Sequence, residues 1–189
     1  MDRRIKKSQK AIESALIELM REKDFEEITI NSIAEKADVS RGTIYLNYDD
    51  KYCILEKCID KELEKLVKSC VPNENEKSNF NAQTLLLRTL EYIEANSNIF
   101  ITLLENNGVQ TFRDKLLSMV RDRMLFQLKM TGINKDMNSE IFIQFWSVAI
   151  IGLIEWWVKN SLPYSSEEIT KHLFNLLSRN EVIPSLNEK

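Results

Sequence analysis

The stretch that decides the fold is residues 30–48, which read Ile-Asn-Ser-Ile-Ala-Glu-Lys-Ala-Asp-Val-Ser-Arg-Gly-Thr-Ile-Tyr-Leu-Asn-Tyr. A first helix of about eight residues, N-capped by Thr29 or Asn31, is followed by a tight turn at 37–39 and by Ser40, a good N-cap for a second short helix. Two short helices joined in this way form the helix-turn-helix plan, in which the second helix lies in the major groove of DNA. The stretch therefore predicts a DNA-binding helix-turn-helix.

The second helix is expected to have two chemically different faces. Val39, Ile44 and Tyr48 form a rear face that can pack on the first helix, because residues 44 and 48 are one turn apart. The opposite face is expected to meet the DNA, and it consists of Arg41, Gly42, Thr43, Tyr45, Leu46 and Asn47.

The forward side chains suggest particular contacts. Arg41 can pair with guanine and Asn47 with adenine, each through two hydrogen bonds. The hydroxyls of Thr43 and Tyr45 can reach phosphate oxygens. Gly42 has no side chain, so it lets the backbone come close to a phosphate.

Further contacts are expected on both sides of this helix. Lys51 opens the next helix, where its ammonium can contact phosphate together with the N-terminal amides. The complete predicted DNA-contacting set is Thr29, Ser40, Arg41, Gly42, Thr43, Tyr45, Leu46, Asn47, Tyr48 and Lys51. The first ten residues contain five basic side chains and one acidic one. They are either a solvated tail or an arm that contacts phosphate.

The whole chain predicts an all-α protein. Its 189 residues include only four glycines and three prolines, which argues against turn-rich β folds and glycine-rich α/β folds. The spacing of apolar residues predicts further helices at about 3–23, 50–70, 80–95, 97–106, 109–130, 137–160 and 165–178. We expect a helix-turn-helix domain at 1–50, a connecting helix at 51–71, a regulatory and dimerisation domain at 80–179 and a tail at 180–189. The polar segment 72–79 is the expected connection between domains.

Charge, cysteine and histidine content exclude several classes of protein. The formal net charge of −3 excludes a uniformly basic surface but not a local basic patch. Three cysteines, an odd number, favour a reducing and therefore cytoplasmic compartment, and the polar first residues do not resemble a signal peptide. His172 is the one histidine, so the paired Glu-x-x-His motifs of a helical di-metal enzyme cannot form. We expect no catalytic site, metal or cofactor.

The motif as a whole resembles a known family. Ile33-Ala34-Glu35-Lys36-Ala37-Asp38-Val39-Ser40-Arg41-Gly42-Thr43-Ile44-Tyr45, followed by Tyr48 and Lys51, is similar to the DNA-binding domain of the TetR family, over about residues 8–55. The resemblance implies a dimeric transcriptional regulator, expected to be a repressor. Asp38 stands at a turn position usually held by Gly, and Leu46 and Asn47 stand where aromatic residues or His are usual. The operator preference is therefore not carried over by analogy.

The C-terminal part resembles a regulatory-domain subtype of that family. The matching segments are residues 103–108 and 152–157, with Pro163 and the pair at 167–168, within about residues 100–178. The subtype includes a regulator of a dihydroxyacetone kinase operon.

An apolar run indicates where a homodimer would form. Residues 141–154 are 14 residues without a charge, and a helix that is apolar nearly all round is buried on more than one side. The run is shorter than the roughly 20 apolar residues that span a bilayer, so no membrane segment is expected. The last helix has its own apolar stripe. The predicted dimer interface is Ile150, Ile154, Trp157, Ile169, Leu173 and Leu177.

The resemblance also implies a small-molecule effector in the regulatory domain. The apolar residues that would line its pocket are Tyr92, Phe100, Leu104, Phe112, Leu116, Phe142, Phe145 and Trp146. The alternative is a C-terminal domain that binds a protein partner instead. A closed cavity of ligand size would favour the effector, whereas a solid core with an exposed apolar patch would favour the partner.

Overall fold

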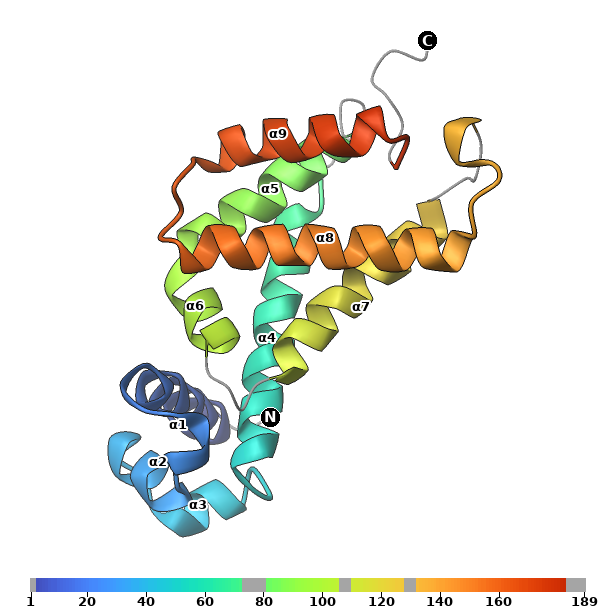
Figure 1. Ribbon diagram of the computed structural model, residues 1–189. Helices are drawn as coiled ribbons and strands as arrows, with labels where there is room; N and C mark the ends of the chain where they lie inside the picture. The colour runs from blue at the N-terminus through green and yellow to red at the C-terminus, as the bar shows by residue number, and fades with distance from the viewer. Residues whose placement is uncertain (1–2, 73–80, 106–109, 128–131, 183–189) are drawn as a thin grey trace. The chain divides into compact units, whose positions relative to one another are not determined.

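The computed structural model describes residues 3–72, 81–105, 110–127 and 132–182 (Figure 1). In these ranges the regular secondary structure is helical, which confirms the all-α prediction. The elements are α1 (Arg3–Glu22), the 3-10 helix η1 (Phe25–Glu27), α2 (Ile30–Lys36), α3 (Arg41–Tyr45), α4 (Lys51–Cys70), α5 (Ala82–Ala95), α6 (Ser97–Glu105), α7 (Gln110–Gln127), the 3-10 helix η3 (Gly132–Asn134), α8 (Ser139–Lys159) and α9 (Ser166–Arg179). The predicted connection at 73–79 and most of the predicted tail lie outside the described residues.

The chain forms two compact units. The N-terminal unit comprises residues 1–65 and 98–112, and the C-terminal unit comprises residues 66–97 and 113–189. The units are thus not contiguous along the chain. Residues 98–112, which the sequence analysis placed with the regulatory domain, cluster with the helix-turn-helix.

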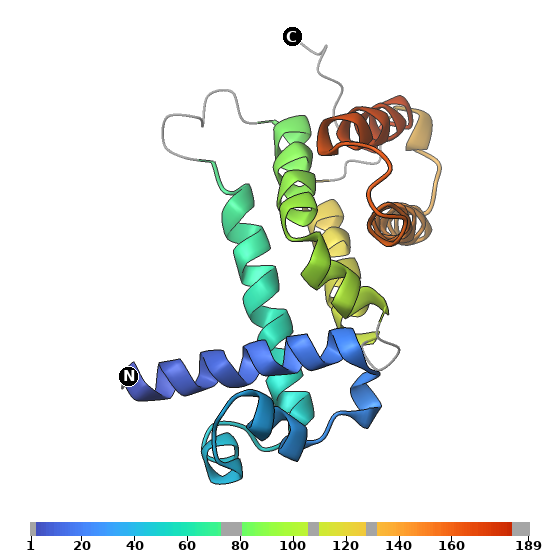
Figure 2. The same cartoon turned by 90° about the vertical axis from the view of Figure 1, so that its left-hand side faces the viewer.

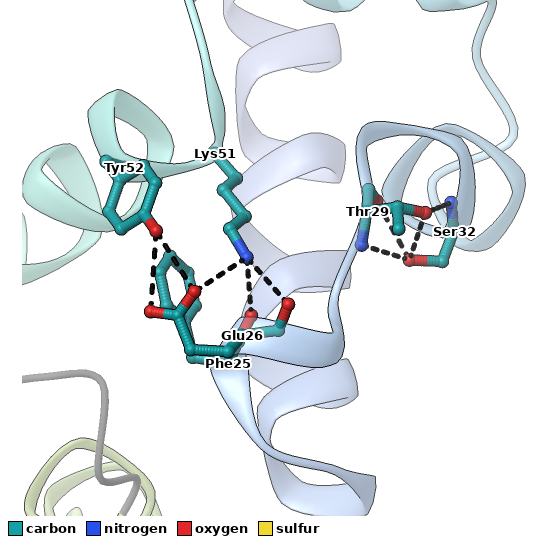
Figure 3. A network of polar contacts seen from close by, with 6 residues as sticks. All are labelled: Phe25, Glu26, Thr29, Ser32, Lys51 and Tyr52. Atoms are coloured by element: carbon teal, nitrogen blue, oxygen red, sulfur yellow. Dashed lines mark hydrogen bonds and ion pairs between the residues drawn. The ribbon is translucent and has the colours of Figure 1, made fainter.

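Local capping explains where the short helices of the N-terminal unit begin. The Thr29 hydroxyl accepts the backbone N–H of Ser32 at 3.2 Å, and the Ser32 hydroxyl accepts the N–H of Thr29 in return (Figure 3). Ser40 caps α3 by accepting the N–H of Thr43 at 3.1 Å. Asp50 caps α4 by accepting the N–H of Cys53 at 2.8 Å. Each cap satisfies an amide that the helix itself leaves without a partner.

The core of the N-terminal unit is built around α1. Its predicted stripe is buried as expected, and α1 lies across the N-terminal half of α4 (Figure 2). Ile33 of α2 and Ile44 of α3 are both fully buried, so the rear face of α3 is part of this core. Asp38, in the turn between α2 and α3, has φ of 52°, the left-handed conformation that Asp tolerates better than most residues.

Lys51 joins the start of α4 to η1 (Figure 3). Its Nζ donates to the carbonyl oxygens of Phe25 at 2.9 Å and Glu26 at 3.0 Å, and it lies 3.6 Å from the Glu26 carboxylate. The ammonium also lies 4.7 Å from the centroid of the buried Phe25 ring. The Lys51 side chain is only 15% exposed. The ammonium therefore makes two hydrogen bonds and one ion pair within the N-terminal unit.

The C-terminal unit packs α5 against α9, and α8 and α9 run in opposite directions (Figure 1). Its core cluster consists of Met124, Phe142, Ile143, Leu173, Leu177 and Val182. An ion pair of 2.8 Å between Arg113 and Glu155 links α7 to α8. The carboxylate at the end of the apolar run is thereby paired within the unit.

Helix α8 is long and apolar enough to cross a membrane by length and composition alone. This is weak evidence, because the core helices of soluble proteins meet the same criteria. One face of α8 packs in the core cluster of the C-terminal unit through Phe142 and Ile143.

We expect Lys51→Met to lower the free energy of unfolding by about 1.5–3 kcal/mol, the usual contribution of hydrogen bonds to a charged group. Methionine keeps an apolar stem against Phe25 but removes the ammonium from the two carbonyl groups. Denaturant unfolding measures the loss, and Lys57→Met is the control because Lys57 is exposed on the same helix. Equal stability of the two variants would show that the Lys51 contacts contribute nothing.

We also expect Leu173→Ala to lower the free energy of unfolding by about 2–5 kcal/mol, as truncation of a buried leucine does. Leu173 is 3% exposed, whereas Leu125 of α7, in the same unit, is 60% exposed. The matched substitution Leu125→Ala should therefore change stability by less than about 0.5 kcal/mol. A Leu173→Ala variant as stable as the native protein would remove Leu173 from the core.

Candidate nucleic-acid interface

Helix α3 presents one buried and one exposed face, as the sequence analysis predicted. Ile44 is fully buried, whereas Arg41 and Gly42 are exposed. Tyr45 is 51% exposed and Leu46 is 87% exposed. Two large apolar side chains side by side on a short exposed helix are unusual for a surface that only meets water. The forward face is thus open to a partner.

Two predicted contact residues also cap helices. Ser40 accepts the N–H of Thr43, and the hydroxyls of these two residues lie 2.9 Å apart. Thr29 is exposed while it caps α2. Thr43 is half-buried. The hydroxyls of Ser40 and Thr43 are therefore oriented by each other at the start of α3.

Gly42 is not required by packing within the chain. A Cβ added there would meet only the Ser40 Oγ at 3.6 Å, an ordinary van der Waals distance. The space above Gly42 is thus left open on the exposed face of α3. This agrees with a close approach of the backbone to a phosphate.

Asn47 lies just beyond the end of α3 and is half-buried. Its Nδ2 donates to the carbonyl oxygen of Thr43 at 2.7 Å. One of its two amide hydrogens is therefore already used. The remaining hydrogen and Oδ1 would have to serve the predicted contact with adenine.

Two predicted DNA contacts are turned inward and require correction. Tyr48 is 6% exposed, and its hydroxyl donates to the Glu13 carboxylate at 2.6 Å. Burial and this hydrogen bond raise the pKa of Tyr48 well above its usual value. Lys51 is engaged with Phe25 and Glu26, as described above. Neither side chain offers phosphate a polar group without breaking these contacts.

Glu13 and Lys61 are residues that the sequence analysis missed. The ammonium of Lys61 donates to the two oxygens of Glu13 at 2.6 and 2.8 Å. The sequence held one indication of this contact: Tyr48 lies on the rear face of the second helix, where its buried hydroxyl would need a hydrogen-bond partner. The identity of that partner could not be inferred, because Glu13 is 35 residues away in the chain.

The basic start of the chain is helical. Helix α1 begins at Arg3, and its exposed basic residues are Arg3, Arg4, Lys6, Lys7 and Lys10. They occupy the first turns of a helix whose later turns form the core of the N-terminal unit. The positive charges are therefore carried by an ordered element.

The predicted effector-pocket residues separate into two groups. Phe142, Phe145 and Trp146 line an open groove of about 460 Å³ in the C-terminal unit, together with Met137, Ile141 and three asparagines. Phe100 and Phe112 are instead fully buried in the N-terminal unit, edge to face with their ring centroids 5.5 Å apart. These two phenylalanines are core residues, which corrects the prediction for them.

The other predicted pocket residues are spread over both units. Leu104 belongs to the N-terminal unit and is half-buried. Tyr92 is half-buried and Leu116 is buried, both in the C-terminal unit. None of these three lines the groove of about 460 Å³.

Most residues of the predicted dimer interface are buried within a single chain. Five of its residues have at most 7% of their surface exposed within a single chain, namely Ile154, Trp157, Ile169, Leu173 and Leu177. The indole N–H of Trp157 also donates to the carbonyl oxygen of Tyr164 at 2.8 Å. Ile150 is half-buried against the core cluster. These side chains pack inward because both stripes close the core of their own unit.

The exposed apolar side chains lie elsewhere on the same two helices. On α8 they are Ile141, Phe145, Val148 and Trp156, which with Gly152 follow one line along the helix. A Cβ added to Gly152 would meet nothing within 4 Å. On α9 the exposed apolar residue of note is Leu176, which is 51% exposed. We call these six residues the α8–α9 apolar surface.

Metal-binding clusters and reactive cysteines are two further classes of site. Among the described residues, no group of three or more His, Cys, Asp or Glu side chains could hold a metal ion. Cys58 is buried, and burial raises the pKa of its thiol to about 12. This thiol stays protonated near neutral pH, which disfavours a redox role.

Comparisons with known proteins agree with this arrangement. Residues 12–58 match a family described as bacterial regulatory proteins, tetR family, and residues 81–179 match one described as a transcriptional regulator C-terminal region. The uncharacterized HTH-type transcriptional regulator YxbF of Bacillus subtilis (strain 168) is 25% identical over 177 residues. The match covers 89% of this chain and 44% of that protein, so the chain spans less than half the length of its relative.

Solved structures show the same fold. A TetR transcriptional regulator from Streptococcus agalactiae 2603V is 24% identical, with a TM-score of 0.73 over 93% of this chain and 96% of that one. The dihydroxyacetone kinase operon activator DhaS is 17% identical, with a TM-score of 0.62 over 94% and 98%. NalD, the secondary repressor of the MexAB-OprM multidrug efflux pump in Pseudomonas aeruginosa, is 19% identical, with a TM-score of 0.62 over 93% and 96%.

The resemblance read from the sequence is thereby confirmed for both parts of the chain. The two matched segments include the helix-turn-helix and most of the C-terminal helices. The chain belongs to the TetR family of DNA-binding transcriptional regulators.

Proposed function

We propose that the protein is a cytoplasmic repressor that binds a palindromic operator as a homodimer and is released by a small-molecule effector. The observation that carries the proposal is the exposed face of α3, with Arg41 and Leu46 directed outward from a well-packed rear face. Two such helices in a dimer would occupy successive major grooves, about one DNA turn apart or a multiple of it. The domain assignment follows, with DNA binding near 1–50 and regulation and dimerisation near 80–179.

We assign base reading to the exposed side chains of α3 and its end. Arg41 suits guanine, which offers two acceptors in the major groove. Leu46 suits the methyl group of thymine, because an exposed apolar side chain gains from contact with it. Asn47 is retained as a reader of adenine through its remaining amide hydrogen. Thr43 and Tyr45 are assigned to phosphate.

We place the homodimer on the α8–α9 apolar surface. An apolar line of this length on a helix is rarely left in water, and a two-fold axis would bring the same line of a second copy against it. Gly152 lies within the line, and the open space above it allows two helices to approach closely.

We propose the open groove of the C-terminal unit as the effector site. Its volume of about 460 Å³ is within the range of small-molecule sites, and its lining is mostly apolar with three asparagine amides. An effector would release the operator only if it binds the non-operator state more tightly. Ile141 and Phe145 belong both to this groove and to the α8–α9 apolar surface, so a protein partner, the second candidate, would compete with the second copy of the chain for them.

The direction of regulation needs a functional assay. NalD is described as a repressor and DhaS as an activator, and both share this fold. A reporter gene behind the bound operator should be silenced by the protein. Rising expression on addition of the protein would make it an activator.

We expect Arg41→Ala to reduce the discrimination between operator and random DNA by about 1–3 kcal/mol, the usual contribution of a bidentate base contact. Selection from a random duplex library, followed by titration of the selected sites, measures this. Arg21→Ala is the control, because Arg21 is an exposed arginine at the far end of α1. An unchanged consensus and affinity for Arg41→Ala would exclude base reading by Arg41.

We expect Val148→Arg combined with Leu176→Arg to give a folded monomer that binds the palindromic site weakly. Both side chains are exposed, so the charges should not disturb the core, but they would meet their symmetry mates across the two-fold axis. Sedimentation equilibrium measures the mass, and Lys171→Glu, on another face of α9, should leave it unchanged. A double variant that remains dimeric would place the interface elsewhere.

A further inference from the structure

The Glu13 carboxylate receives two donors from different parts of the N-terminal unit. The Tyr48 hydroxyl donates to Oε1 at 2.6 Å, and the Lys61 ammonium donates to Oε1 and Oε2 at 2.6 and 2.8 Å. The Glu13 side chain is 13% exposed, and that of Lys61 is 49% exposed. Hydrogen bonds to a partly buried carboxylate are stronger than those between neutral groups. One acidic side chain of α1 thus holds both α4 and Tyr48, which lies just beyond the end of α3.

A third contact ties α4 to the same turn of α1. The Cys58 thiol, one turn before Lys61, lies 3.8 Å from the backbone carbonyl oxygen of Glu13. Because burial raises the pKa of this thiol, it remains a donor at neutral pH. Residue 13 is therefore fixed to α4 by its backbone as well as by its side chain. The carboxylate has little freedom to follow Tyr48 if that ring moves.

Tyr48 is in turn coupled to the orientation of α3. Its backbone N–H donates to the carbonyl oxygen of Ile44 at 2.9 Å, so it continues directly from the last turn of this helix. Its ring is buried with Ile44 on the rear face. The forward face, with Arg41 and Leu46, belongs to the same short helix. A rotation of the Tyr48 ring out of its site would therefore move the forward face.

We propose that Glu13 is a positioning residue for DNA recognition, which fixes the angle of α3 through the Tyr48 hydroxyl and the Lys61 ammonium acting together. Glu13 and Tyr48 themselves contact no DNA. The inference rests on the proposal that α3 enters the major groove. It adds a residue that affects DNA affinity from behind α3, without touching the DNA. Packing alone would hold the Tyr48 ring without using its hydroxyl. The hydrogen bond from this hydroxyl to a carboxylate that Lys61 also holds restricts rotation of the ring.

Three variants remove the contacts with little change in shape. Tyr48→Phe deletes only the hydroxyl, Lys61→Met deletes the ammonium and keeps the stem, and Lys61→Arg keeps the charge. Lys57→Met is the matched control, because Lys57 is an exposed lysine one turn earlier on α4. Each full-length variant is titrated with the palindromic site that the native protein selects. The titrations are run at several salt concentrations and well below the unfolding temperature of each variant. The fraction of each protein that is able to bind DNA is determined separately.

We expect Tyr48→Phe and Lys61→Met each to weaken binding by about 3- to 10-fold, because only part of the free energy of the lost hydrogen bonds should appear as a change in DNA affinity. The double variant should be no weaker than the worse single variant, because both act through Glu13. Lys61→Arg should restore the affinity, and Lys57→Met should leave it unchanged. The slope of affinity against salt should stay that of the native protein, because no phosphate contact is lost.

Other outcomes would overturn the proposal in distinguishable ways. A slope that falls by about one unit in Lys61→Met would make Lys61 a direct phosphate contact. A lower unfolding temperature with unchanged DNA affinity would leave the Glu13 contacts with a role in stability alone. If Arg41→Ala and Leu46→Ala also bind normally, the reading surface itself is misassigned, and the proposed function fails first. If Arg41→Ala and Leu46→Ala lose affinity but Tyr48→Phe and Lys61→Met bind normally, only the positioning role of Glu13 is excluded.

Discussion

The short length of α3 is the constraint on which the rest of the N-terminal unit depends. Five helical residues are far too few to be stable alone, because the first turn of a helix is the costly one to form. The helix must therefore be held from outside. Ser40 caps its start, Ile44 anchors its middle in the core, and Tyr48 fastens its end to Glu13. The reading surface is accordingly only as rigid as the packing of α1, α2 and α4 behind it.

The sequence predicted the helices well and their polar partners poorly, for one physical reason. Caps and turns are local, so the cap at Ser40 and the turn at Asp38 could be interpreted from their immediate neighbours, and the structure confirms both. The partners of Lys51 and Tyr48 lie 26 and 35 residues away in the chain. A lysine at the start of a helix suits a phosphate and a backbone carbonyl equally well. Only the folded position of η1 decides between them.

A different limit applied to the C-terminal unit. Helix α8 is apolar on nearly every side, so its periodicity cannot indicate which face packs on its own unit and which is left exposed. Helix α9 does have a clear apolar stripe, and the stripe is buried. The pattern of the stripe predicted this burial, but not whether the same chain or a second copy covers it. Leu173 and Leu177 pack in the core of one chain, and Ile141 and Phe145 remain exposed. The periodicity therefore indicated two apolar helices, but not which of their side chains the chain's own core would bury.

The inward turn of Lys51 and Tyr48 changes how the protein can hold DNA. With a formal net charge of −3, general attraction cannot supply the salt-dependent part of binding, so it must come from local groups. Lys51 is already neutralised within the N-terminal unit, and the forward face of α3 contributes Arg41 beside two apolar side chains. The densest positive charge near this unit is the first turns of α1, where five basic residues are carried on an ordered helix. Within the N-terminal unit, positive charge is therefore concentrated on the first turns of α1, whereas the exposed face of α3 carries one arginine beside apolar side chains.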